Sequence, residues 1–372
     1  MGIHIVKRDN CPLWKKCCFY LAAVVIALLL GAALLSALGV DPIAYYTRMF
    51  TMGTIGNKIA YKVWINYLKE FVPLALVSVA LSLAFKMRFW NIGGEGQFIL
   101  GAISAAFVAF QAGPVLPGFA TLLLMCLAAM AVAGLYGLFV AVLKVKFGTN
   151  ETLMTLMLNY IALYVLMYIG ETKADWNFFL DEASVRPVFA SFAKIVSFPS
   201  IPMGGKFSLN ICVILTFLIG VLVYIYLKYT KQGYEIAVVG DSAGTARYAG
   251  MKVNTIVLRT VFLSAALVGL AAAFKVGTAG ILSTSITDDV GWTGIIVAWL
   301  SQLNTAVIFV VSALICVLHY GSTVAAATFS QVDSSFANML QGVILFLVLA
   351  ADFYTRFRVV IVRKGGNSNG NG

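Results

Sequence analysis

The chain has 372 residues, of which 61% are hydrophobic and 11% are charged, and its formal net charge is +11. Soluble domains carry about 25% charged residues, so these charges are too few to cover a water-facing surface, and lipid must be the solvent for most of the chain. The basic residues lie in short clusters between apolar runs and not in a stripe with stacking aromatics, which argues against nucleic-acid binding. Composition therefore predicts a membrane protein and excludes a soluble enzyme.

The apolar runs predict an all-α, polytopic transmembrane bundle of about ten spans, since a crossing helix needs about 20 apolar residues. The first run follows Lys15 and Lys16 but is longer than the ~7–15-residue core of a signal peptide, so we expect it to be retained. The second contains Lys69, Glu70 and Pro73, which leaves open a start after them. The eighth is too short to cross comfortably, which leaves open a broken or re-entrant helix. The spans are expected at about 19–40, 63–85, 89–112, 119–142, 153–169, 209–227, 256–274, 290–300, 306–329 and 337–353.

An even number of spans places both termini on one side of the membrane, and charge indicates which side. With the termini inside, the cytoplasmic segments collect most of the 26 basic residues, as the positive-inside rule requires. We therefore expect both termini to be cytoplasmic, with a hydrophilic outer loop at about 170–208 and a hydrophilic inner loop at about 228–255. The domain organisation is an N-terminal segment 1–18, a transmembrane domain 19–355 and a C-terminal tail 356–372, whose last residues, rich in Gly, Asn and Ser, are expected to be disordered.

No motif for nucleotide, metal or covalent chemistry is present in the sequence. There is no G-x-x-x-x-G-K-[ST] string, so ATP is not expected to bind this chain. Only His4 and His319 occur, and neither they nor the six cysteines have the spacing of metal ligands. We therefore predict no catalytic residue, no metal and no cofactor.

The string from Asn91 to Gln97 breaks the apolar pattern with three glycines and the carboxylate of Glu95. One interpretation is a helix start near the cytoplasmic interface, where Glu95 favours the positive helix terminus. The other is a gate or pathway element, because a carboxylate before an apolar run is costly unless it is paired or faces a polar cavity. Small residues follow at four-residue spacing and predict tight helix packing: Gly101, Ala105 and Ala109.

A second break places Thr155 and Asn159 on one helical face with Glu151. An unsatisfied amide within an apolar run is expensive, so Asn159 must either bond another helix or line a wet pathway. The candidate pathway residues are therefore Asn91, Glu95, Gln97, Thr155 and Asn159.

The inner loop contains a third feature, in which Asp241 or Ser242 could cap a short helix that ends at Gly250. Such a helix is too polar to enter lipid. It would present three small residues for a partner to contact: Ala243, Ala246 and Ala249. The plain alternative is an ordinary connecting loop.

Together, four strings resemble the membrane permease subunits of bacterial ABC importers for nucleosides and simple sugars, within the branched-chain amino acid and ribose permease superfamily. They are FWNIGGEGQ at 89–97, NE at 150–151 with LNYI at 158–161, GYE at 233–235 with ARYAG at 246–250, and GWTGIIVA at 291–298. The sequence departs from the family pattern after Ala298, where Trp299 and a polar run follow in place of small apolar residues and a turn with proline.

The resemblance implies a type II ABC importer-like permease in the bacterial cell (plasma or inner) membrane. Two permeases, identical or different, would form the pathway, two separate cytoplasmic ATPase subunits would bind ATP, and an extracytoplasmic substrate-binding lipoprotein would deliver the solute. The presence of Glu151 in the second string favours the nucleoside branch of this family over the sugar branch. The inner loop would be the coupling segment that contacts the ATPase, and the residues assigned to it are Glu235, Asp241, Ala243, Ala246, Arg247 and Gly250.

The alternative function is an ion-coupled secondary transporter of a small polar solute. It would need buried ionisable residues near the middle of the membrane. Apart from His319, the sequence predicts almost none in the deep spans. A membrane-embedded transferase is less supported still, because the adjacent pair Asp288–Asp289 lacks metal-ligand spacing.

Overall fold

The computed structural model describes residues 2–7, 12–57, 59–193, 196–204, 206–329, 331–333 and 335–362. The chain forms two compact units, which are described separately: unit 1 comprises Met1–Gly53 and Leu318–Gly372, and unit 2 comprises Thr54–Val317. Both are helical, with short two-stranded sheets only, within the described residues. The expected disordered end of the tail lies outside the described residues.

Unit 2 is built around two long helices, α3 and α10. Their most apolar windows are 83% and 67% buried inside the protein, against 33% for α5, so α3 and α10 form the centre and α5 presents an apolar face outward. The helices and strands of this unit, with α12 continuing into unit 1, are α3 (Ala60–Lys86), α4 (Gly94–Ala112), α5 (Gly118–Phe147), α6 (Glu151–Glu171), β2 (Ser200–Gly204), β3 (Phe207–Asn210), α7 (Ile211–Tyr229), α8 (Lys231–Asp241), α9 (Ala243–Tyr248), α10 (Val253–Ala279), α11 (Val290–Leu300) and α12 (Thr305–Ala326).

Small residues let the central helices approach closely. A Cβ added to Gly101 of α4 would lie 2.8 Å from the Cα of Gly269 in α10, and one added to Gly269 would lie 2.2 Å from the carbonyl oxygen of Ala129 in α5. Ala105 and Ala109 are also buried. The predicted small-residue face of α4 is confirmed, and it packs against α10 as close helix contacts in lipid require.

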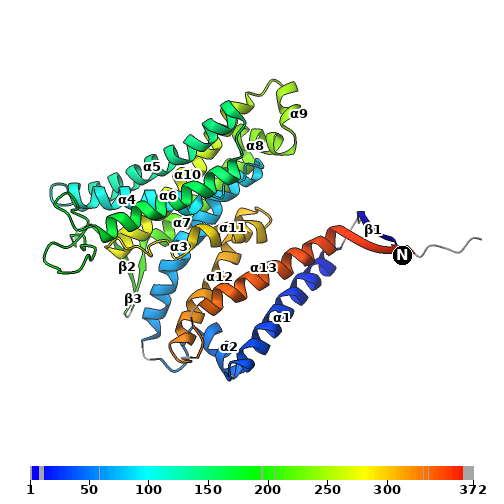
Figure 1. Ribbon diagram of the computed structural model, residues 1–372, viewed down its shortest axis with the longest axis horizontal. Helices are drawn as coiled ribbons and strands as arrows, with labels where there is room; N and C mark the ends of the chain where they lie inside the picture. The colour runs from blue at the N-terminus through cyan, green and yellow to red at the C-terminus, as the bar shows by residue number, and fades with distance from the viewer. Residues whose placement is uncertain are drawn as a thin grey trace, which may run out of the picture. The chain divides into compact units, whose positions relative to one another are not determined.

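One end of unit 2 carries α8 and α9, and the opposite end carries the hairpin of β2 and β3 (Figure 1). The predicted inner loop is therefore a pair of short helices between α7 and α10. The predicted outer loop is the connection from α6 to α7, which contains the hairpin. The two hydrophilic segments thus lie at opposite ends of the unit.

Unit 1 contains α1 (Leu13–Ala37), α2 (Pro42–Phe50) and α13 (Ser335–Arg356), with α1 packed against α13. The buried ring of Tyr45 packs edge-on against Phe336 with 5.2 Å between ring centroids, and its hydroxyl lies 2.7 Å from the Ser322 hydroxyl. Strand β1 (Gly2–Lys7) pairs antiparallel with β4 (Phe357–Val362). This pairing brings the first and last described strands together.

Nine helices are long and apolar enough to cross a membrane among the residues that the structure describes, and α11 is not one of them. With 11 residues, α11 is about 16 Å long, roughly half of a ~30 Å hydrocarbon core. The predicted eighth span is therefore a half-length helix with the expected bounds. Helix α3, by contrast, runs without interruption through Lys69, Glu70 and Pro73.

Candidate translocation and docking sites

The segment between α3 and α4 is not helical, and its residues alternate between exposed ones, such as Arg88 and Trp90, and buried ones, such as Phe89 and Asn91. Arg88, with a φ of 56°, reverses the chain after α3, and Trp90 then stacks on Trp299 at 5.2 Å. Backbone at membrane depth must find partners within the protein. Helix α6 supplies them here: Thr155 Oγ1 accepts from the Ile92 N–H at 3.2 Å.

Asn159 bonds this segment at two places. Its Nδ2 donates to the carbonyl of Ile92 at 2.9 Å, and its Oδ1 accepts from the N–H of Gly96 at 2.8 Å. The side chain is 4% exposed. Of the two predicted alternatives for Asn159, the structure shows bonding to another element, with both ends of the amide satisfied.

Asn91 and Gln97 form a reciprocal amide pair within the same network. Asn91 Nδ2 donates to Gln97 Oε1 at 3.2 Å, and Gln97 Nε2 donates to Asn91 Oδ1 at 3.1 Å, which also accepts from the N–H of Gly93. The structure therefore brings four of the five candidate pathway residues into one buried network that fixes residues 91–97 against α6. A gate at this position would have to break these bonds.

The fifth candidate, Glu95, points away from that network. Its Oε2 accepts from the backbone N–H of Gly291 at 2.8 Å, and the Thr287 hydroxyl also bonds its carboxylate. Asp289 precedes α11 but provides no side-chain cap. Glu95 therefore caps a helix other than its own, because its carboxylate satisfies an N–H in the first turn of α11.

Side-chain caps define the helix pair α8–α9. Thr230 Oγ1 accepts from the N–H of Gly233 at 3.1 Å to start α8, and Ser242 Oγ accepts from the N–H of Thr245 at 3.2 Å to start α9. Gly250 has a φ of 75° just past the end of α9, a conformation that favours glycine. Of the two predicted cap residues, Ser242 is the cap, and Asp241 is the last residue of α8.

The predicted partner-facing surface of α9 needs one correction. Ala243 and Ala249 are exposed, but Ala246 is 0% exposed and packs in an apolar cluster with Ile236 and Val253. A helix of this length must anchor one side on the bundle, and a small apolar residue allows the closest approach. Arg247 and the 96% exposed Tyr248 stand on the outward side instead.

Glu235, another residue predicted to contact the ATPase, forms an ion pair within the helical bundle. Its Oε2 lies 3.0 Å from Nη2 of Arg259, which joins α8 to α10.

An open hollow borders α9 and is lined by residues of the α3–α4 turn, the α5–α6 turn and the helix pair, among them Arg88, Lys144, Glu151, Asp241 and Arg247. Lys144 and Glu151 form an ion pair of 2.7 Å across the α5–α6 turn.

Sequence reasoning placed too few charges inside the spans. The seventh span was expected to end at 274, whereas α10 continues to Ala279 and carries Lys275 within it. Lys275 Nζ lies 2.5 Å from Asp288 Oδ2. Lys69, by contrast, was already placed in the second expected span, and it stands within α3.

These features define a polytopic membrane protein whose helical bundle holds an internal polar segment and presents a short capped helix pair at one end. The chain belongs to the family of permease components of branched-chain amino acid transport systems, whose sequence model matches residues 63–349. It is thus a multi-pass ABC transporter permease subunit, not an enzyme.

Three relatives give the level of similarity. A glucose ABC transporter permease protein of Haloferax volcanii is 27% identical over 98% of this chain and 96% of its own length. A guanosine ABC transporter permease protein of Bacillus subtilis is 28% identical over 93% and 96%. A nucleoside ABC transporter permease protein of Lactococcus lactis is 27% identical over 83% and 84%. No solved structure matches the chain.

Proposed function

We propose that this chain is the transmembrane subunit of an ATP-driven importer that takes up a nucleoside or a simple sugar. The observation that carries the proposal is the capped helix pair α8–α9, which presents exposed residues at one end of a membrane bundle. Family membership gives that surface an expected partner, a separate ATPase. The names of the relatives supply the substrate classes, guanosine, nucleosides and glucose.

The end of unit 2 that carries α8 and α9 is assigned to the cytoplasm. Lys144, Lys231, Arg247 and Lys252 belong to its helix ends and turns, and basic residues favour the cytoplasmic side. Two ATPase subunits would contact this end, one through each permease of a homo- or heterodimer, and a substrate-binding lipoprotein would contact the opposite end. The pairing of β1 with β4 supports a shared side for both termini, and we assign that side to the cytoplasm.

Close contacts give α8–α9 a route to the polar segment. A Cβ added to Gly240 of α8 would lie 2.1 Å from the carbonyl oxygen of Lys86, the last residue of α3. The segment from Asn91 to Gln97 follows within a few residues. A shift of the helix pair on ATP binding by the partner would move the end of α3 and act on the Asn159 network, so we propose that Asn91, Glu95, Gln97, Thr155 and Asn159 belong to the gate. Coupling of this kind is a free-energy difference between two states.

The test is uptake by the reconstituted transporter. The chain is co-purified with a candidate ATPase, a second permease and a binding protein, and ATP-dependent uptake of labelled guanosine and of labelled glucose into proteoliposomes is measured. ATP-dependent accumulation of one of them is expected. Absence of ATP-dependent uptake of either, with an intact complex, would refute the assignment.

The ion pair between Lys275 and Asp288 favours one second candidate, an ion-coupled transporter. Ionisable residues at membrane depth mark ion and proton pathways in such proteins. Uptake driven by a proton gradient in vesicles that contain this chain and no ATPase would establish it.

A further inference from the structure

A second open hollow lies where α3 and α7 end and α12 begins, at the end of unit 2 that carries α8 and α9. Lys86 of α3, Lys228 of α7 and Thr305 of α12 line it, and we name it the Lys86–Lys228 hollow. Its volume is about 370 Å³, which is in the range of ~300–1,000 Å³ that small-ligand sites have. Packing holds its walls in place, since Phe217 of α7 and Phe309 of α12 stack with 4.9 Å between ring centroids.

Both charged side chains in the lining of this hollow are cations, Lys86 and Lys228. Lys86 is half-buried, and its ammonium group makes no hydrogen bond or ion pair with the part of the chain that the structure describes. A charge that is partly withdrawn from water is costly unless an opposite charge lies near it. Tyr224 orients Lys228, whose Nζ donates to the phenol oxygen at 2.9 Å. The hollow therefore presents two cations without a counter-charge and favours an anion.

The start of α12 adds to the positive potential of the Lys86–Lys228 hollow. Asn304 and Thr305 line the hollow, and Asn304 Oδ1 accepts from the N–H of Ala306 at 3.1 Å, which fixes the amide at this end of the helix. The N-terminus of a helix carries a partial positive charge and N–H groups without partners in the helix, so it stabilises a nearby anion. This contribution has the same sign as that of the two lysines.

The surroundings of the Lys86–Lys228 hollow indicate that the anion is amphipathic. Trp90 and Trp299 stack beside the turn from α11 to α12, and both are exposed. Exposed tryptophans at the ends of membrane helices mark the interface where lipid headgroups lie. On the same side of α7 as Lys228, the preceding turns expose apolar side chains to the acyl chains of a lipid: Leu218, Val221 and Ile225. A lipid can therefore place its phosphate in the hollow and its chains along α7.

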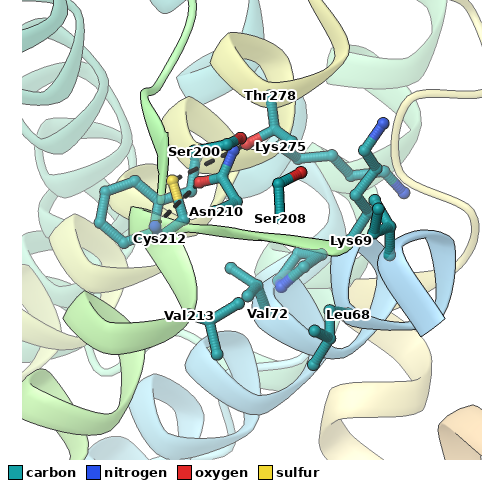
Figure 2. A pocket seen from close by; sticks show the side chains of 13 residues that line it. Leu68, Lys69, Val72, Ser200, Ser208, Asn210, Cys212, Val213, Lys275 and Thr278 are labelled. Atoms are coloured by element: carbon teal, nitrogen blue, oxygen red, sulfur yellow. Dashed lines mark hydrogen bonds between the residues drawn. The ribbon is translucent and has the colours of Figure 1, made fainter. Parts of the chain in front are cut away.

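Two other hollows of unit 2 differ from this one in charge or in size. The hollow beside α9 contains Glu151 and Asp241 in addition to its basic residues. The pocket between α3, α10 and the β2–β3 hairpin (Figure 2) is lined by Lys69 and Lys275, but its volume of about 40 Å³ is too small for a lipid headgroup. Lys275 is also paired with Asp288.

We propose that the Lys86–Lys228 hollow binds the phosphate of an anionic phospholipid from the membrane leaflet at this end of the bundle, with Lys86 and Lys228 as its cationic contacts. Basic pockets between membrane helices are a recurring form of such sites. The proposal goes beyond the proposed function, because it depends neither on the solute nor on ATP. A free phosphate ester shares the chemistry of the headgroup, and the experiment separates the two sources. A bound lipid would lie next to the close approach of Gly240 in α8 to the Lys86 carbonyl.

The experiment measures lipid binding to the purified full chain in detergent by native mass spectrometry, with phosphatidylglycerol and phosphatidylcholine of the same acyl chains as probes. We expect saturable binding of phosphatidylglycerol and much weaker binding of phosphatidylcholine. The double variant Lys86→Gln with Lys228→Gln should weaken phosphatidylglycerol binding about tenfold or more, because each basic residue near an anionic lipid contributes to its binding. The matched control is Lys231→Gln with Lys252→Gln, which removes two exposed lysines that do not line the hollow and should bind as the wild type does.

Several results would overturn the inference. These are equal affinity of the wild type for the two lipids, unchanged phosphatidylglycerol affinity in the double variant, and an equal loss of affinity in the matched control. Displacement of phosphatidylglycerol by an equal concentration of inorganic phosphate would show a site for a soluble anion and would also overturn it. Loss of ATPase co-purification in the double variant, with lipid binding unchanged, would assign the hollow to the ATPase instead.

Thermal unfolding without added lipid identifies any variant that has lost its fold. Lys228→Gln alone keeps the test valid in that case, because Lys228 is exposed, and it should weaken phosphatidylglycerol binding several-fold. The binding measurement contains no ATPase and no solute. A negative result would therefore refute the lipid site alone, whereas absence of ATP-driven uptake with lipid binding as expected would refute the proposed function alone.

Discussion

The carboxylate of Glu95 accepts a hydrogen bond from the backbone N–H of Gly291, with 2.8 Å between Oε2 and N, and so joins the first turn of α4 to the first turn of α11. The two residues are 196 positions apart in the chain. Gly291 is buried in the first turn of α11 and Glu95 is 8% exposed, so water has little access to this N–H. Glu95 supplies the acceptor that water would supply elsewhere.

Gly291→Ala should destabilise the protein. An added Cβ would lie 2.3 Å from the Glu95 nitrogen and 2.5 Å from its Cα and Oε2, and the backbone would have to shift. Overpacking of this kind costs about 1–3 kcal/mol, which thermal unfolding of the purified protein would detect. Gly342→Ala is the matched control, because a Cβ at Gly342 of α13 meets nothing within 4 Å. A lowered midpoint in the control, or an unchanged one in Gly291→Ala, would contradict the packing argument.

Asn159→Leu should also lower stability, because it removes two hydrogen bonds and leaves the Ile92 carbonyl and the Gly96 N–H buried without them. A buried polar group without its partner costs about 1–3 kcal/mol. The midpoint of thermal unfolding should fall well below that of Met157→Leu, whose side chain is 62% exposed on the same helix. Equal midpoints would show that the residue 91–97 segment does not depend on Asn159.

The sequence alone predicts features that are local and misses those that need the third dimension. Helix α11 was expected at 290–300 and has those bounds, because its apolar run stands between polar turns. The strings around Glu95 and Asn159 were singled out because polar groups interrupt apolar runs. Neither string indicates that Asn159 bonds Ile92 or that Glu95 bonds Gly291, since those partners are far away in the chain.

Ala246 shows the same limit at a smaller scale. In the sequence Ala243, Ala246 and Ala249 are equivalent, and spacing of three places them on one side of a helix. The structure separates them because the apolar residues Ile236 and Val253 of neighbouring elements meet at Ala246. Those residues lie on other elements, so no pattern within α9 predicts which alanine they cover.

Tryptophan substitutions on α9 distinguish its two sides. Ala246→Trp places an indole into a fully buried site and should lower the yield and thermal stability of the inserted protein. Ala243→Trp changes an exposed residue and should leave both unchanged, but it should abolish co-purification with the ATPase and ATP-driven uptake. Normal ATPase binding by Ala243→Trp would remove α9 from the docking surface, and a stable Ala246→Trp would show that α9 does not pack as described.

The ion pair between Glu235 and Arg259 gives the last test, because it links the helix pair to α10. The two side chains are 17% and 33% exposed, so solvent screens the pair and its contribution to stability should be small, about 1 kcal/mol or less. If α8–α9 moves as a lever, Glu235→Gln should lower ATP-driven uptake far more than it lowers thermal stability or ATPase binding. The exchanged pair Glu235→Arg with Arg259→Glu restores the contact with reversed charges and should recover uptake. Two results would contradict this role for the ion pair: a loss of uptake that only follows a loss of stability, and a stable exchanged pair that does not recover uptake. Movement of α8 would then reach the membrane helices through another contact. The close approach of Gly240 to the Lys86 carbonyl is the nearest such contact.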